Sequence, residues 1–274
     1  MIKSESYSLN IGGQLIVLSQ PIVMGILNIT PDSFFSDSRK QTEAEIAQRV
    51  QQIIDEGGSI IDIGGYSTRP GATEVSEQEE LKRLQYALKI VRREAPDTVV
   101  SIDTFRANVA KQCADEFGAV IINDVSGGED PEMFPLVASM GLPYILTYAV
   151  PAKESIVPEM LKRLSEQVAQ LRILGQKDII LDPGFGFGKS LEDNYEVINN
   201  LETFQSFKLP VLVGISRKSM IQRVLNCTPQ DALNGTTVLH ALAIEKGASI
   251  LRVHDVKACM EVIKILQKCS SISA

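Results

Sequence analysis

Eight short apolar runs, rich in β-branched residues, recur along the chain. Their apolar positions are continuous rather than alternating, as in strands that are buried on both faces of a parallel sheet. The runs lie at 21–28, 59–65, 98–104, 119–126, 143–149, 178–184, 210–216 and 249–255. Amphipathic segments separate them, and two of these segments, 42–58 and 76–95, open with the Thr/Ser-x-x-Glu spacing of a helix capping box. The pattern therefore predicts repeated strand–helix units.

Eight such units predict an α/β fold, a (β/α)8 TIM barrel with an N-terminal β-hairpin. A doubly wound open sheet has the same alternation and is the alternative. The hairpin is expected at 7–19, where two short apolar segments flank Gly12-Gly13. We expect a single domain over residues 1–274, in which residues 1–20 form the hairpin and cap the barrel.

Composition narrows the possible partners. A formal net charge of −7 and a pI near 5.1 disfavour nucleic acid or an anionic membrane as the main partner. The N-terminus is polar, and no apolar run reaches the roughly 18 residues of a membrane-spanning helix. Four scattered cysteines and only two histidines argue against structural zinc and favour a cytoplasmic protein.

Polar residues stand where nearly every predicted strand ends. In barrels of this kind the chemistry sits at the carboxyl ends of the strands, which meet at one rim. Any one of these residues is as readily a turn former or a helix cap, but so many together predict a site at that rim. They are Asn28, Asp62, Asp103, Asn123, Asp124, Thr147, Asp182, Ser216, Arg252 and His254.

Three of these residues favour a flat ligand with several N–H donors. The carboxylates of Asp103 and Asp182 can each accept two parallel N–H bonds from a guanidine-like edge, and Asn123 can pair with a neighbouring amide edge. Guanine and pterin both have such an edge. Only one of Asn123 and Asp124 can point inward, and Asp62 is equally well explained as a buried cap.

Basic residues gather on the loops after the second, seventh and eighth strands, at Arg69, Arg217, Lys218, Arg252 and His254. The last two of these loops are the usual phosphate corner of a barrel. Arg252 and His254 are two apart on a strand and so face the same way, whereas Arg217 is equally well explained as a structural arginine. A ligand with an anionic tail is indicated.

The segment that follows the first strand, 28–38, is long, polar and aromatic, as a mobile lid is. Asn28 and the lid carboxylates could share a Mg²⁺ ion with a diphosphate. The alternative is a surface loop in which Pro31-Asp32-Ser33 is only a turn.

The stretch "LDPGFGFGKS" (181–190) looks like a phosphate-binding loop but fails its spacing. The G-x-x-x-x-G-K-[ST] pattern needs a glycine at 183, where Pro183 has no N–H to donate. Alternate glycines also fail the G-x-G-x-x-G pattern. The stretch instead predicts a strand that delivers Asp182 to a loop. We expect Lys189 to be a surface residue and Lys218 to be the functional lysine.

Seven motifs, in order from the first strand to the last, resemble those of the dihydropteroate synthase family. They are "MGILNITPDSF" (24–34), "IIDIGGYSTRPG" (60–71), "VSIDT" (100–104), "INDVSGG" (122–128), "LDPGFGFGK" (181–189), "GISRKS" (214–219) and "LRVHDV" (251–256). The resemblance implies an enzyme that joins 6-hydroxymethyl-7,8-dihydropterin diphosphate to p-aminobenzoate, giving 7,8-dihydropteroate and diphosphate in folate biosynthesis. It also implies a homodimer and sensitivity of the family to p-aminobenzoate mimics.

The resemblance assigns expected roles to residues. The pterin is expected at Asp103, Asn123, Thr147, Asp182 and Lys218, and the diphosphate at Asn28, Thr68, Arg69, Arg252 and His254. The p-aminobenzoate is expected at Thr68, Arg69, Pro70, Phe187, Lys218 and Ser219, and Mg²⁺ at Asn28 and Asp37. The catalytic set is then Asp103, Lys218, Asn28, Arg252 and His254. The amine of p-aminobenzoate is itself the nucleophile, so the difficult step is loss of diphosphate, which the basic corner and Mg²⁺ would stabilise.

The chain departs from the family pattern in three places. After the fifth strand, Thr147-Tyr148-Ala149 replaces the usual Met-His-Met, so an apolar contact with the pterin is lost. In the first lid Ser36 stands where the family has its acid, which leaves Asp37 or Asp32 for that role. Tyr66 replaces a glutamate before "STRPG".

Two alternative functions remain open at this stage. A pterin-dependent methyltransferase shares the barrel and the head-group site but has little use for "SRKS" and "RVH". A catalytically silent paralogue that only binds pterin would be consistent with the changes at 147–149. A generic phosphate-binding aldolase barrel is less favoured than either, since no strand-end lysine is placed for a Schiff base.

Overall fold

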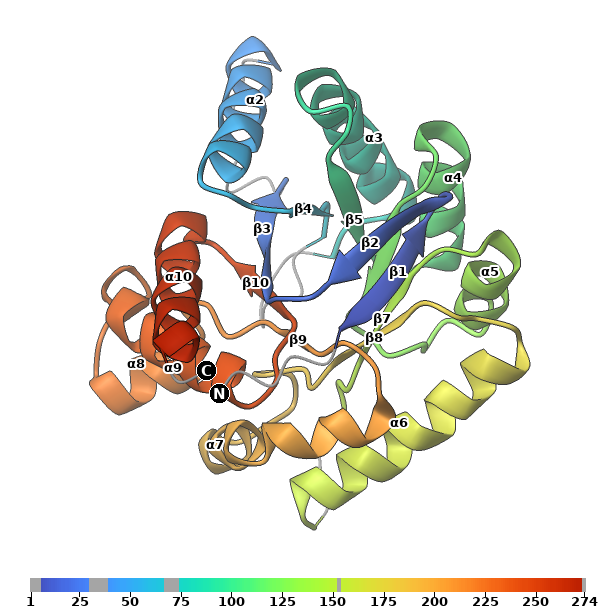
Figure 1. Cartoon of the computed structure of the whole chain (residues 1–274). Coiled ribbons are helices and arrows are strands. Elements are labelled where there is room, and N and C mark those ends of the chain that lie inside the picture. The colour runs from blue at the N-terminus through green and yellow to red at the C-terminus, as the bar shows by residue number, and fades with distance from the viewer. Residues whose placement is uncertain (1–5, 30–38, 67–73, 152–153, 273–274) are drawn as a thin grey trace.

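The chain forms a closed eight-stranded barrel inside a ring of helices (Figure 1). The computed structural model describes residues 6–29, 39–66, 74–151 and 154–272, with the backbone alone for 39–42. The barrel strands are β3 (Ile22–Asn28), β4 (Ile60–Gly64), β5 (Val99–Asp103), β6 (Ile121–Asp124), β7 (Tyr144–Thr147), β8 (Ile179–Asp182), β9 (Leu212–Val213) and β10 (Ile250–Val253). Each lies within one of the eight apolar runs, so the predicted strands are confirmed.

Helices follow the strands in the order that the sequence predicts. They are α2 (Arg39–Asp55), α3 (Glu77–Glu94), α4 (Ala107–Phe117), α5 (Met133–Met140), α6 (Ile156–Ile173), α7 (Leu191–Asn199), α8 (Ser219–Leu225), α9 (Leu233–Glu245) and α10 (Val256–Ile272), with 3₁₀ turns η1 (Leu201–Phe207) and η2 (Gln230–Ala232). The Ser76 cap of α3 is confirmed, because its hydroxyl accepts the Glu79 N–H at 3.3 Å. Helix α2 begins at Arg39, three residues before the expected cap at Thr42.

Strand order and closure decide between the two predicted sheets. The strands pair in parallel in the order β8-β7-β6-β5-β4-β3-β10-β9. A parallel bridge between Leu181 and Val211 then joins β8 to the far edge, and the Leu181 N–H donates to the Pro210 carbonyl at 2.9 Å. The sheet is therefore a barrel, and the open-sheet alternative is wrong.

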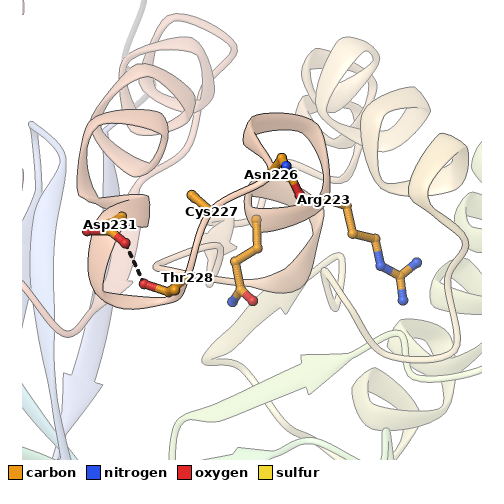
Figure 2. Close-up of a pocket in the computed structure, with 6 residues that line it drawn as sticks. Arg223, Asn226, Cys227, Thr228 and Asp231 are labelled. Atoms are coloured by element: carbon orange, nitrogen blue, oxygen red, sulfur yellow. Dashed lines mark hydrogen bonds between the residues drawn. The ribbon is translucent and has the colours of Figure 1, made fainter.

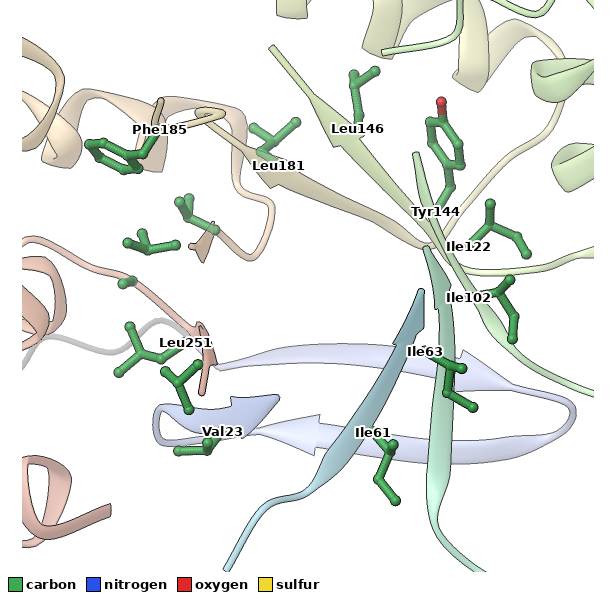
Figure 3. Close-up of a cluster of buried hydrophobic side chains, with 14 of the residues drawn as sticks. Val23, Ile61, Ile63, Ile102, Ile122, Tyr144, Leu146, Leu181, Phe185 and Leu251 are labelled. Carbon is green, nitrogen blue, oxygen red and sulfur yellow. The ribbon is translucent and has the colours of Figure 1, made fainter. Parts of the chain in front are cut away.

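Strand residues of one parity pack outward against the helices. Figure 3 shows these side chains, among them Ile61, Ile63, Ile102, Leu146 and Leu251, which belong to the main buried cluster of the protein. Because both faces of each strand are covered, outward and inward positions are both apolar near the amino ends. This burial on two faces is the reason that the runs read as continuous in the sequence.

Residues of the other parity point into the barrel and form two layers. The lower layer, at the amino ends of the strands, is aliphatic and consists of Met24, Ile60, Ile121, Ile145, Ile180, Leu212 and Ile250. Two or four positions further along the same strands, the inward residues become polar. The barrel therefore has an apolar floor beneath a polar upper layer, and the polar layer lies at the carboxyl rim.

A hairpin of β1 (Tyr7–Ile11) and β2 (Gln14–Leu18) covers the amino end of the barrel (Figure 1). Leu9, Ile11 and Leu18 are buried against the aliphatic floor. The turn requires glycine, because Gly12 has a φ of +59° and a Cβ added there would lie 2.4 Å from the Ala119 Cβ. No helix in the described part of the chain is both long enough and apolar enough to cross a membrane.

His240 is an unusual buried residue on α9. Its side chain is only 2% exposed, and neither ring nitrogen has a hydrogen-bond partner within the described chain. Burial disfavours the charged imidazolium and lowers the pKa of His240 from 6.5 to about 4, although the Asp255 charge opposes this shift. The folded protein therefore holds a neutral imidazole.

We expect His240 to make the protein sensitive to acid. Because the folded pKa lies below the unfolded one, its contribution is fully present above pH 6.5 and is lost as the pH falls toward 4. Linkage predicts a loss of about 2 kcal/mol in the free energy of unfolding between pH 7 and pH 5. Urea unfolding of His240→Leu at both pH values should show a smaller loss than the wild type; an equal loss would contradict the assignment.

Candidate active site

Four strands bring an ion-pair cluster together in the polar layer. Arg252 on β10 donates from Nε to Asp62 Oδ2 at 2.6 Å and from Nη2 to Asp103 Oδ2 at 2.7 Å. Asn123 on β6 donates from Nδ2 to both oxygens of Asp62 at 3.3 Å. The Arg252 side chain runs alongside Gly214, where an added Cβ would lie 3.9 Å from its Cβ and Cδ, an ordinary contact distance. One guanidinium therefore serves two carboxylates.

Sharing one cation between two carboxylates leaves Asp103 weakly compensated. The pKa of Asp103 is raised to about 7, mainly by burial and also by the charge of Asp62, while Arg252 opposes the rise. The Asp62 side chain is fully buried, whereas that of Asp103 is 16% exposed. Asp103 is thus the carboxyl of the pair that a ligand can reach, and it changes charge near neutral pH.

Asp182 and Lys218 form a second group at the rim, next to the first, because Lys218 Nζ lies 4.0 Å and Arg252 Cδ 3.9 Å from the place that a Cβ on Gly214 would take. Asp182 ends β8, and its Oδ1 accepts the Gly184 N–H at 2.8 Å. Lys218 donates to the Phe185 carbonyl, and its ammonium lies 5.0 Å from the centroid of the Phe187 ring. Burial raises the pKa of Asp182, with Lys218 opposing, and burial lowers the pKa of Lys218 to about 8. Carboxylate, ammonium and aromatic ring thus face one region.

Three buried polar atoms in the upper layer have no partner within the described chain. They are Ser101 Oγ on β5, Asn123 Oδ1 on β6 and Thr147 Oγ1 on β7. Each belongs to an inward-facing residue that is at most 1% exposed. A buried polar atom without a partner costs about 1–3 kcal/mol, so the upper layer has hydrogen-bonding capacity that only a ligand or water can satisfy.

Asn28 and His254 lie at the ends of neighbouring strands, β3 and β10. Asn28 is half-buried, and its Oδ1 lies 3.5 Å from the place that a Cβ on Gly64 would take, beside Asp103. The His254 N–H donates to Ser216 Oγ at 3.2 Å, and its carbonyl accepts Arg49 Nη2 at 2.7 Å. Arg49 comes from α2, so this helix fixes the backbone at His254.

The structure decides one open alternative and corrects one prediction about charged residues. Asp62 is not a helix cap but the fully buried partner of Arg252 and Asn123. Asp62 lies two residues after Ile60, which faces the interior of the barrel, so the two residues share the inward side of β4. Lys189 is not a surface residue, because it is half-buried and its ammonium donates to three backbone carbonyls, those of Tyr148, Gly184 and Phe187.

The structure decides two alternatives that the sequence left open. Asp124 faces outward, where it accepts the Tyr144 hydroxyl at 2.7 Å and the Ser126 and Gly128 N–H groups, so Asn123 is the inward residue of the pair. Arg217 is structural, because it pairs with Asp255 through two bonds of 2.7 and 2.9 Å and also donates to two carbonyls.

Of the remaining candidate residues, the structure describes two. Phe187 is half-buried on the loop after β8, and Ser219 is exposed at the first residue of α8. The expected residues Asp32, Ser36, Asp37, Thr68, Arg69 and Pro70 lie outside the described residues.

Tyr66, which departs from the family pattern, belongs to an aromatic–cation cluster at the end of β4. Its ring meets Phe105 edge-on at 5.3 Å, and the Arg106 guanidinium lies over both rings. Arg106 also pairs with Glu80, a fully buried carboxylate on α3 that accepts the Thr104 hydroxyl at 2.6 Å. This cluster fixes Thr104, the residue that follows Asp103.

A separate surface hollow lies beyond the end of α8 (Figure 2). Its lining is mostly exposed and polar, and Thr228 Oγ1 donates to Asp231 Oδ2 at 2.6 Å. It shares no residue with the polar layer of the barrel, so the candidate site is at the rim. The lining residues are Gln222, Arg223, Asn226, Cys227, Thr228 and Asp231.

Comparison with known proteins agrees with this geometry. A family model described as pterin binding enzyme matches residues 24–254, which span the barrel from β3 to the end of β10. The fold and the site are therefore those of a pterin-binding barrel enzyme.

Similar proteins identify the family to which the chain belongs among the pterin-binding enzymes. Dihydropteroate synthase of Escherichia coli K12 is 38% identical over 266 residues, covering 93% of this chain and 94% of that protein, and that of Bacillus subtilis 168 is 41% identical over 250 residues, covering 89% and 87%. The structure of the Xanthomonas albilineans enzyme with 4-aminobenzoic acid superposes with a TM-score of 0.88 at 34% identity, covering 97% of this chain and 99% of that one. The chain belongs to the dihydropteroate synthase family.

Proposed function

We propose that this protein condenses 6-hydroxymethyl-7,8-dihydropterin diphosphate with p-aminobenzoate, releasing diphosphate and 7,8-dihydropteroate. The observation that carries the proposal is the polar upper layer, in which two carboxylates with raised pKa values face two cations above an apolar floor. A silent binding protein would not need this many buried charges, each of which costs free energy.

The pterin is proposed to lie in the upper layer. Asp182 would accept N–H groups from its guanidine-like edge, and the amide of Asn123, whose Oδ1 has no protein partner, would pair beside it. Lys218 would donate to the ring oxygen or nitrogen that carries a lone pair. Thr147 adds an inward hydroxyl at the end of β7, next to Asp182 in register.

Diphosphate is proposed to leave toward Arg252, His254 and Asn28, with Thr68 and Arg69 completing the corner. Arg252 holds two carboxylates in the structure, so it would have to share its free N–H donors with the anion. These cations would stabilise the negative charge that develops as the C–O bond breaks.

Mg²⁺ fits this corner, because Asn28 supplies an oxygen ligand of the kind that Mg²⁺ prefers. No group of three or more His, Cys, Asp or Glu side chains within the described ranges could hold a metal ion by itself. Mg²⁺ commonly takes only one or two protein ligands beside substrate phosphates. When bound, the ion would neutralise charge on the leaving diphosphate. Asn28 and Asp37 are the proposed ligands.

The chemistry needs no nucleophile from the protein. As diphosphate departs, positive charge develops on the pterin methylene and ring, and the ionised Asp103 would stabilise it. The amine of p-aminobenzoate then attacks. Phe187 and Lys218 would place its ring, together with Ser219, Thr68, Arg69 and Pro70.

Diphosphate release by the purified protein tests the proposal. The assay contains Mg²⁺ and the pterin diphosphate, with and without p-aminobenzoate. Release that requires p-aminobenzoate supports the synthase. Binding of the pterin without any release would indicate a silent paralogue, and binding of a methylated reduced folate without use of the diphosphate would indicate a methyltransferase.

Thr147→Val should separate the two roles of this hydroxyl. Valine has the same shape, so the unliganded protein should be more stable by about 1 kcal/mol, because a buried hydroxyl without a partner is removed. If the hydroxyl bonds the pterin, the pterin should raise the melting temperature of the variant less than that of the wild type. An equal rise in both proteins would mean that the hydroxyl does not contact the ligand.

A homodimer, a single domain over 1–274 and a cytoplasmic location complete the proposal. Several large apolar side chains are exposed on the neighbouring helices α8, α9 and α10, which supports a dimer; they are Val224, Leu225, Val238, Leu242 and Ile265. None of the four cysteines, all within the described residues, forms a disulfide, as expected in a reducing compartment. Sedimentation of the wild type would measure the assembly.

A further inference from the structure

Lys189 makes an unusual set of contacts for a lysine in a glycine-rich loop. Its ammonium donates to the carbonyls of Tyr148 at 3.0 Å, Gly184 at 2.7 Å and Phe187 at 3.2 Å. It also lies 4.9 Å from the centroid of the Tyr148 ring. All three donors of the ammonium are therefore used, and they join the loop after β8 to the segment after β7.

The glycines of the loop allow this approach. A Cβ on Gly184 would lie 2.1 Å from the Tyr148 carbonyl oxygen, and one on Gly188 would lie 3.1 Å from Pro151 N. Both residues also have positive φ, +67° and +60°. The loop from 183 to 189 is thus built directly onto the backbone of 148–151, and Lys189 fastens it there.

The inner side of the same loop holds Lys218. Its side chain runs beneath Gly186, with Cδ 3.4 Å from the place of an added Cβ, and it donates to the Phe185 carbonyl. Its ammonium faces the Phe187 ring. The loop therefore lies between two lysines. Lys189 binds carbonyls on its outer side, and Lys218 binds the Phe185 carbonyl on its inner side.

We propose that Lys189 is a positioning residue that clamps the loop from 183 to 189, and so sets the place of Phe187 and Lys218 for p-aminobenzoate. The inference rests on the proposed function. The clamp acts through the loop and touches no substrate. Without it, the carbonyls of Gly184 and Phe187 lose a charged donor, and a loop with three left-handed glycines gains alternative conformations.

The clamp also includes a contact between the Lys189 ammonium and the ring of Tyr148, a residue that departs from the family pattern. The family pattern has a histidine at this position, whereas the tyrosine ring here lies against the Lys189 ammonium. Burial lowers the pKa of Lys189 to about 8, so a polarisable ring beside the ammonium helps to keep it charged. Replacing the ring should weaken the clamp, while removing only the hydroxyl should not.

Hydrogen exchange and steady-state kinetics of Lys189→Met test the proposal together. Amide exchange in a peptide covering 183–189 should become at least tenfold faster. KM for p-aminobenzoate should rise at least tenfold, whereas the Kd of the pterin should rise much less, because Asp103, Asn123 and Asp182 are on strands and only Lys218 among these proposed pterin contacts meets the loop. Lys189→Arg should recover most of both effects.

Matched variants distinguish the clamp from general damage. Lys162→Met, at an exposed lysine on α6, and Tyr148→Phe should leave exchange and KM unchanged, while Tyr148→Leu should shift both in the direction of Lys189→Met. Unchanged exchange in Lys189→Met would overturn the clamp. Faster exchange with an unchanged KM, or an equal loss of pterin affinity, would overturn its role in placing p-aminobenzoate. Absence of turnover in the wild type counts against the proposed function alone, since exchange still reports the clamp.

Discussion

Asp103→Asn is expected to lower kcat by about 10²–10³-fold, the usual effect of removing one group that stabilises charge in a transition state. Asparagine keeps the size of the side chain and its bond from Arg252, but it removes the negative charge beside the pterin. The loss should therefore appear in kcat more than in the KM of p-aminobenzoate, since the charge is needed when diphosphate departs.

The pH profile gives a second readout for Asp103. Burial raises its pKa to about 7, so below that pH the carboxyl is neutral and cannot stabilise a cation. The kcat/KM of the wild type, which reports groups of the free enzyme, should rise with pH through about 7. Lys218, whose pKa is lowered to about 8, should give the decline at higher pH.

The asparagine variant should lose the acid limb and keep the decline at higher pH. Asp115→Asn, at an exposed aspartate on α4, is the control and should behave as the wild type. An acid limb that persists in Asp103→Asn would assign it to another group, and near-normal kcat would remove Asp103 from the reaction.

Arg252→Met is expected to destabilise the protein by about 3–5 kcal/mol, because removing one partner of a buried ion pair leaves the other charges uncompensated. Arg252 donates to both Asp62 and Asp103. Asp62 is fully buried, and it also accepts hydrogen bonds from the neutral amide of Asn123. Methionine fills much of the same volume, so the cost should be electrostatic rather than a cavity.

A double-mutant cycle with Asp62→Asn distinguishes the electrostatic cost of losing Arg252 from the cost of a cavity. If the uncompensated carboxylate is responsible, adding Asp62→Asn to Arg252→Met should restore part of the lost free energy of unfolding, measured in urea. Arg223→Met, at an exposed arginine on α8, should change stability by no more than about 0.5 kcal/mol. A small loss in Arg252→Met, or no recovery in the double variant, would show that the ion-pair cluster contributes little.

The sequence alone was enough to predict the barrel. Burial on both faces makes each strand a continuous apolar run, and eight such runs with amphipathic segments between them have few other solutions. The hairpin at 7–19 was also predictable, because Gly12-Gly13 interrupts two apolar segments. Strand parity showed that only one of Asn123 and Asp124 can point inward, since successive residues of a strand face opposite sides.

The sequence could not predict which polar residues meet. Arg252 and Asp62 are 190 positions apart and bond only because the order of the strands places β10 two strands from β4. The sequence left open whether Asp62 is a buried cap or part of the site, because local spacing does not reveal a partner so distant. The early start of α2 at Arg39 was likewise hidden, because a capping-box pattern occurs inside the helix.

Lys189 and Arg217 show what the sequence determines and what only the tertiary structure determines. In the sequence both are basic residues on loops near the rim, where Lys189 was expected at the surface and Arg217 was a candidate for the anion site or a structural arginine. The tertiary structure decided that Arg217 pairs with Asp255 away from the site and that Lys189 holds three carbonyls from two loops. The sequence by itself determined where the strands end and which residue types stand there. Only the closed barrel decided their partners, because partners are set by distances between strands and not along the chain.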